Sequence, residues 1–164
     1  MPTRCSKNDV HESTHDFNVP DFIHIYETES TIDWKELQVF IRDNVGDVAK
    51  VDLRKRFISM VIEKDTDADS VAKRFVATKV FDVSDPKKTY DPFSVEIEHE
   101  KKLILGSSDK GPVMLYDGFR LQRLFRELLS KPESNFKHMH IVFTNRPIAT
   151  WDSGDGRYHA RTSV

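Results

Sequence analysis

Residues 22–26 read FIHIY, and residues 48–53 read VAKVDL. The first run is short, β-branched and aromatic, which favours a buried strand, and the second run alternates as a strand does. Between them lies a helical pattern over residues 31–44, with Thr31 as its N-cap and Gly46 at its end. The whole segment therefore predicts a β-α-β unit.

Beyond this unit, the sequence contains both helical and strand-like patterns. Further helices are predicted over residues 68–80 and 118–130, the second with a continuous apolar stripe. Residues 95–100 alternate apolar side chains or histidine with glutamate, which predicts an exposed strand with one acidic face. Residues 57–62 are apolar but too few to distinguish a strand from a helix. We expect a layered α/β domain with a mixed sheet and about three helices.

The length of 164 residues fits one domain. Residues 1–20 are polar and are expected to form a flexible tail, which leaves residues 21–164 as a single α/β domain. Residues 161–164 still have strand character, and this favours a domain truncated at its C-terminus.

The charge and cysteine content limit the class of protein. Lysine and arginine number 25 against 27 acidic residues, and a net charge of −2 disfavours binding to nucleic acid or to an anionic membrane. Cys5 is the only cysteine, which fits a reducing compartment, and no signal peptide or membrane span is evident. We expect a cytoplasmic protein. The sequence does not predict partners or an oligomeric state.

The first candidate for chemistry is the pentapeptide His11-Glu12-Ser13-Thr14-His15, which has the spacing of a zinc-protease motif. On a helix, His11 and His15 would bind the metal and Glu12 would activate a water molecule. The segment contains poor helix formers and precedes the first predicted strand. A chance match in an exposed tail is therefore the favoured interpretation.

The second candidate is a pair of predicted strands near the C-terminus, beginning at His138 and Tyr158. If these strands pair and bury their apolar side chains on one face, His138, His140 and His159 lie together on the other face. Three imidazoles in this arrangement form a workable zinc site with an open fourth position. Alternatives are an anion or ligand site at Arg146 and Arg161, or an ordinary polar face.

Several stretches resemble a known family. They are Leu115 to Phe125, His140 to Arg146, Thr150-Trp151-Asp152 and Arg157 to Arg161. The chain resembles the amino-terminal half of an uncharacterised archaeal family labelled as metallopeptidases, distantly similar to archaemetzincins. The resemblance implies the amino-terminal part of a metzincin-like fold, and it implies that the half with the zinc motif and the catalytic glutamate is missing here. No catalytic residue can be carried over to this chain.

Three functions stay open from the sequence. The favoured one is a non-catalytic or truncated α/β domain related to zinc metallopeptidases. The alternatives are a zinc-dependent metallopeptidase-like hydrolase and an α/β module that binds a ligand or partner. Zinc is the candidate cofactor, although no cofactor is required by the residues alone, and whether the chain is an enzyme is left undecided.

Overall fold

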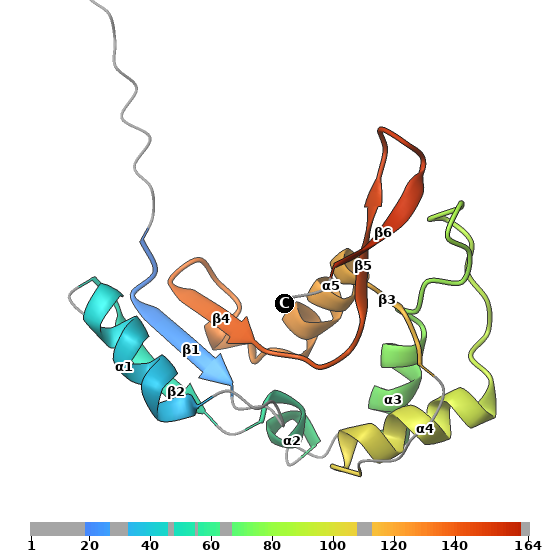
Figure 1. The fold of residues 1–164 in the computed structure, drawn as a ribbon. Helices are drawn as coiled ribbons and strands as arrows, with labels where there is room; N and C mark the ends of the chain where they lie inside the picture. The colour runs from blue at the N-terminus through green and yellow to red at the C-terminus, as the bar shows by residue number, and fades with distance from the viewer. Residues whose placement is uncertain are drawn as a thin grey trace, which may run out of the picture.

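Two three-stranded sheets with helices packed against them make up the fold, a layered α/β arrangement as expected (Figure 1). The structure is a computed structural model that describes residues 19–26, 33–45, 48–54, 56–62, 67–107 and 113–161. In chain order the elements are β1 (Phe22–Tyr26), α1 (Trp34–Val45), β2 (Lys50–Arg54), α2 (Phe57–Ile62), α3 (Ala68–Val76), α4 (Ser94–Ile104), β3 (Tyr116–Asp117), α5 (Gly118–Leu128), the 3-10 helix η1 (Lys131–Glu133), β4 (His138–Val142), β5 (Ile148–Asp152) and β6 (Arg157–Arg161).

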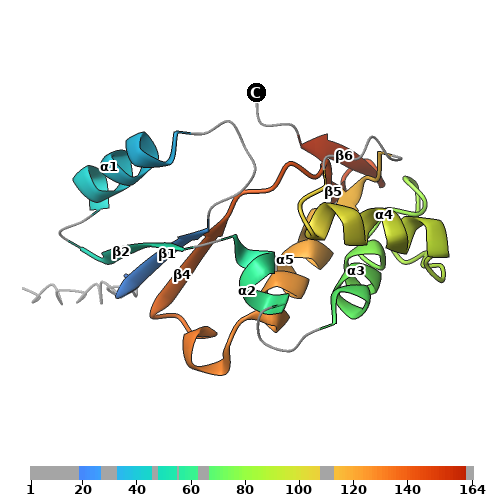
Figure 2. The ribbon, with the colours of Figure 1, turned by 90° about the horizontal axis from the view of Figure 1, so that it is seen from below.

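The first sheet has the strand order β2-β1-β4, and β1 runs parallel to both neighbours. This confirms the predicted β-α-β unit. Helix α1 lies over one face of the sheet (Figure 2). Its Trp34, Leu37 and Ile41 pack against the buried cluster that contains Ile23 and Ile25. The even-numbered side chains of β1 therefore point to the opposite face of the sheet.

Side-chain caps mark where two of the helices begin. Asp33 accepts hydrogen bonds from the backbone N–H groups of residues 35 and 36, at 2.9 and 3.2 Å, and so caps α1. The predicted caps at Thr31 and Gly46 lie outside the described residues. Asp117 caps α5 by accepting from residues 119 and 120 at 2.9 and 3.1 Å. The predicted helices near 31–44, 68–80 and 118–130 are confirmed, with shifted ends.

The main core lies between α2, α3, α4 and α5. Residues 57–62, which the sequence left undecided, form α2, and Phe57 of this helix makes edge contacts with Tyr26 and Phe125. Phe75 and Leu121 are almost completely buried in the same cluster. In the described part of the chain, no helix is both long enough and apolar enough to cross a membrane.

The predicted strand over residues 95–100 is wrong, because these residues belong to helix α4. Glu96 accepts a hydrogen bond from the backbone N–H of Phe93 at 3.1 Å, which fixes the start of the helix. Both Glu96 and Glu100 are buried, where Lys79 and Arg146 neutralise them. The inward face of α4 is therefore partly acidic, and the apolar periodicity of an amphipathic helix is missing from its sequence.

The predicted pairing of the strands that begin at His138 and Tyr158 is also wrong. Strand β4 lies in the first sheet beside β1, whereas β6 pairs with β5 in a second sheet of order β3-β5-β6. The turn between β5 and β6, with Gly156 at a φ of 68°, closes the hairpin that projects at the top of Figure 1. Strand β4 pairs with β1 over its full length, and alternation within β4 does not indicate which strand is its neighbour.

Candidate metal centre

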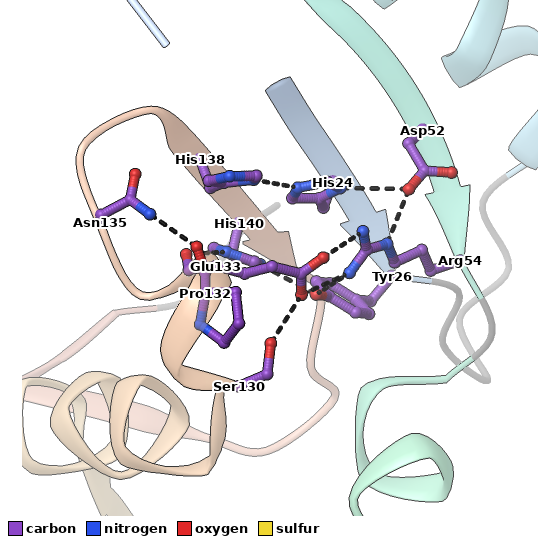
Figure 3. Close-up of polar contacts among 10 residues, drawn as sticks. All are labelled: His24, Tyr26, Asp52, Arg54, Ser130, Pro132, Glu133, Asn135, His138 and His140. Carbon is purple, nitrogen blue, oxygen red and sulfur yellow. Dashed lines mark hydrogen bonds and ion pairs between the residues drawn. The ribbon is translucent and has the colours of Figure 1, made fainter. Parts of the chain in front are cut away.

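Polar side chains cover the face of the first sheet that α1 leaves open. We call this set the histidine face: His24, Tyr26, Asp52, Arg54, His138 and His140 from the three strands, with Glu133 of η1 lying over them (Figure 3). The parallel register explains the grouping, since His24 lies opposite Asp52 on one side and opposite His140 on the other. Side chains with the same parity on neighbouring strands point to the same face.

His24 lies at the centre of the histidine face and is only 2% exposed. Its Nδ1 is 3.1 Å from Oδ2 of Asp52, and its Nε2 is 2.8 Å from Nδ1 of His138. Burial lowers the pKa of His24 below 6.5, although the hydrogen bond to Asp52 acts in the opposite direction. A carboxylate can only accept, so Nδ1 of the neutral ring carries the hydrogen and Nε2 directs its lone pair at His138.

His140 has the opposite arrangement of hydrogens. Its Nε2 is 3.1 Å from the backbone carbonyl of Glu133, and its Nδ1 is 2.9 Å from the hydroxyl of Tyr26. Since a carbonyl can only accept, Nε2 carries the hydrogen and the Tyr26 hydroxyl donates to Nδ1. Burial lowers the pKa of His140, which favours this neutral form. Both of its ring nitrogens are thus engaged by the protein.

Arg54 and Glu133 form a two-bonded ion pair at the edge of the face. Nη1 and Nη2 of Arg54 donate to the Glu133 carboxylate at 2.9 and 2.7 Å, and Nε donates to Asp52 at 2.7 Å. The hydrogen bonds from Arg54 lower the pKa of Glu133 to about 2. Arg54 therefore helps to hold two carboxylates, those of Asp52 and Glu133, in their ionised form.

A cavity of about 650 Å³ lies beside the histidine face, between α5, η1 and β4. Glu133, His138 and His140 form part of its wall. Within the described part of the chain, no hydrogen bond engages Nε2 of His138. A polar cluster with a partly uncommitted imidazole, at the wall of a cavity of this size, has the form of a binding site.

Three ligand atoms of the histidine face are close enough to share one ion. Single side-chain atoms of His24, Glu133 and His138 lie within 4.8 Å of one another. A second group, Asp152, Asp155 and His159, meets the same distance limit in the β5–β6 hairpin, but its two carboxylates are exposed. His159 lies 2.8 Å from Asp155 there.

The site residues predicted from the sequence do not lie together in the structure. His138 and His140 lie on the histidine face, whereas His159 lies in the other sheet. Arg146, whose side chain is 9% exposed, pairs with Glu100, and Arg161 donates to Thr150 at 2.9 Å, so the two arginines do not converge on one site. The pentapeptide with His11, Glu12 and His15 lies outside the described residues.

Five residues of the face were missed in the sequence: His24, Tyr26, Asp52, Arg54 and Glu133. His24 and Asp52 lie in the two strands of the predicted β-α-β unit, and each alternates with apolar neighbours. Parallel pairing of those strands would have placed the two side chains together. Glu133 follows Pro132 in a short polar segment. Nothing in the sequence indicates that it reaches Arg54, 79 residues earlier.

These features define an α/β chain with a cluster of histidines and a glutamate whose side-chain atoms are close enough together to hold a metal ion. The chain belongs to the family described as "Probable metallopeptidase family (DUF6775)", whose model matches residues 19–164. That description mentions neither an archaeal origin nor archaemetzincins, which stay predictions from the sequence. No curated protein and no solved structure matches the chain significantly.

Proposed function

We propose that the chain binds a zinc-class divalent ion at His24, His138 and Glu133, as the metal centre of a metal-dependent peptide hydrolase. The observation that carries this proposal is the convergence of one ligand atom each from His24, Glu133 and His138 within 4.8 Å. Nε2 of His24 and Nδ1 of His138 lie 2.8 Å apart in a hydrogen bond that the ion would replace. Asp52 holds the far nitrogen of His24. A carboxylate behind a ligating histidine is the usual outer support of zinc sites.

The residues present fit such an ion. Zinc requires neutral imidazole, and burial favours that form of His24. Glu133 is ionised at neutral pH, and its Oε1 accepts one hydrogen bond, from Nη2 of Arg54, so it retains a lone pair. His140 fits less well, because its Nε2–H is donated to a carbonyl.

The remaining groups of the face have supporting roles in this proposal. A zinc ion supplies Lewis-acid chemistry toward a carbonyl oxygen. Asp52 fixes the tautomer and the ring orientation of His24, and Arg54 keeps Glu133 turned toward the two histidines. Tyr26 and the Glu133 carbonyl hold His140 beside them. A substrate would reach the centre from the cavity that His138 lines.

Zinc titration by calorimetry at neutral pH tests the proposal, together with metal analysis of the purified protein. We expect about one zinc per chain for the wild type and a loss of about 100-fold or more in affinity for His138→Ala, since one of three ligands is removed. His159→Ala, in the other sheet, is the matched control and should bind as the wild type does. No zinc uptake by the folded wild type, or equal losses in both variants, contradicts the proposal.

A non-catalytic α/β module is the second candidate function. It is supported by the hydrogen bonds of the histidine face, because His24, His140, Asp52 and Glu133 all have protein partners without any ion. Polar groups satisfied in this way are also expected of a purely structural face. A folded chain that takes up no zinc would favour this second function.

A further inference from the structure

The cavity beside the histidine face has an apolar wall of its own. Phe57, Leu121 and Phe125 line it, and so does Phe136, which is 92% exposed. The volume of about 650 Å³ lies within the usual range of ligand sites, about 300–1,000 Å³.

One positive charge on this cavity is uncompensated. Arg126 lines it from α5, on the same helix face as Gln122 four residues earlier. No carboxylate of the described residues pairs with Arg126, and the other fully charged group of the lining, Glu133, is already neutralised by Arg54. The cavity thus combines an apolar wall with a single free guanidinium.

We propose that this cavity binds the C-terminal residue of a peptide, with an apolar side chain inside and the terminal carboxylate on Arg126. A guanidinium binds a carboxylate through two parallel hydrogen bonds. In a peptide, the C-terminal residue is the place where a main-chain carboxylate and an apolar side chain occur together. This inference rests on the proposed function for the choice of a peptide, and it assigns Arg126 and the apolar wall as determinants of specificity.

Calorimetric titration with three probes tests this assignment: acetyl-Ala-Ala-Phe with a free carboxylate, the same peptide as its C-terminal amide, and 3-phenylpropionate. Each is titrated into the full chain with EDTA and again with zinc. We expect the acid peptide to bind at least about tenfold more tightly than the amide, since a charge-assisted pair is lost. In Arg126→Gln this preference should vanish. Arg123→Gln, an exposed arginine of α5 outside the cavity lining, is the matched control and should keep it.

Each outcome has a defined meaning. Equal binding of acid and amide, or a preference that persists in Arg126→Gln, overturns the assignment. Binding of 3-phenylpropionate as tightly as the acid peptide also overturns it, in favour of a small carboxylic acid. Failure of the metal centre gives a different result, because zinc uptake is then absent while the carboxylate preference in EDTA persists. Arg126→Lys, which keeps the charge, should retain part of the preference and so separates loss of charge from misfolding.

Discussion

Replacement of Glu133 by glutamine should lower the free energy of unfolding by about 2–3 kcal/mol at pH 7 in metal-free protein. The magnitude follows from the ion pair with Arg54. A fall in the pKa of the Glu133 carboxyl from 4.5 to about 2 corresponds to about 3 kcal/mol of preference for the ionised form in the folded chain. The two side chains are 18% and 26% exposed, so solvent screens a small part of this energy.

The sign of the pH dependence follows from the direction of the shift. The pKa of Glu133 is lower in the folded than in the unfolded chain, so its contribution is complete above pH 4.5 and is lost as the pH falls toward 2. Urea unfolding in EDTA at pH 7 and at pH 3 should therefore show a difference between wild type and Glu133→Gln that shrinks with acid. The fluorescence or circular dichroism midpoint measures it.

Glu127→Gln is the matched control for this experiment. Glu127 pairs with Arg74 at 2.8 Å, but the two side chains are 55% and 39% exposed, and such a pair contributes at most about 1 kcal/mol. Equal losses in the two variants, or a loss below about 0.5 kcal/mol for Glu133→Gln, would refute the reasoning that burial and two-bonded geometry give the Arg54 pair its strength.

Three further substitutions have defined outcomes. Asp52→Asn should weaken zinc binding by about 10–100-fold in calorimetry, because it removes the charge that orients His24, and unchanged affinity would count against that support. Tyr26→Phe should cost about 1–3 kcal/mol in urea unfolding, since the partly buried Nδ1 of His140 loses its donor; a neutral result would show that this hydrogen bond does not stabilise the fold. Gly118→Ala should cost about 1–3 kcal/mol and lower the Tm, because the methyl group of the new alanine would lie 2.8 Å from Cγ2 of Ile148. An unchanged Tm would show that β5 moves to accommodate the methyl group without a cost in stability.

Local patterns predicted those parts of the fold that local interactions determine. The β-α-β unit and the amphipathic helix α5 carry their own apolar periodicity, and both were found. Helix α4 was missed because its buried glutamates have partners far away in the chain, Lys79 and Arg146. Strand β4 was assigned correctly but paired wrongly, since its neighbour β1 begins 116 positions earlier and no turn connects them. Pairing at that separation leaves no local trace in the sequence.

The candidate site, like the fold, was predicted only in part. Alternation in β4 identified His138 and His140, and the same argument applied to β1 and β2 would have added His24 and Asp52. His159 was grouped with them only through the wrong pairing. Glu133 depends on a short 3-10 helix that turns its carboxylate back toward Arg54, and this reversal is a tertiary feature.

The ion pair of Glu100 and Arg146 has a consequence for how a ligand would enter. Arg146 lies in the short connection between β4 and β5, and it is held by a carboxylate of α4 that is completely shielded from solvent. The ion pair thus attaches the connection between the two sheets to helix α4. We expect a preformed cavity that admits its ligand without a hinge motion, with an association rate that rises linearly with ligand concentration and shows no slow isomerisation.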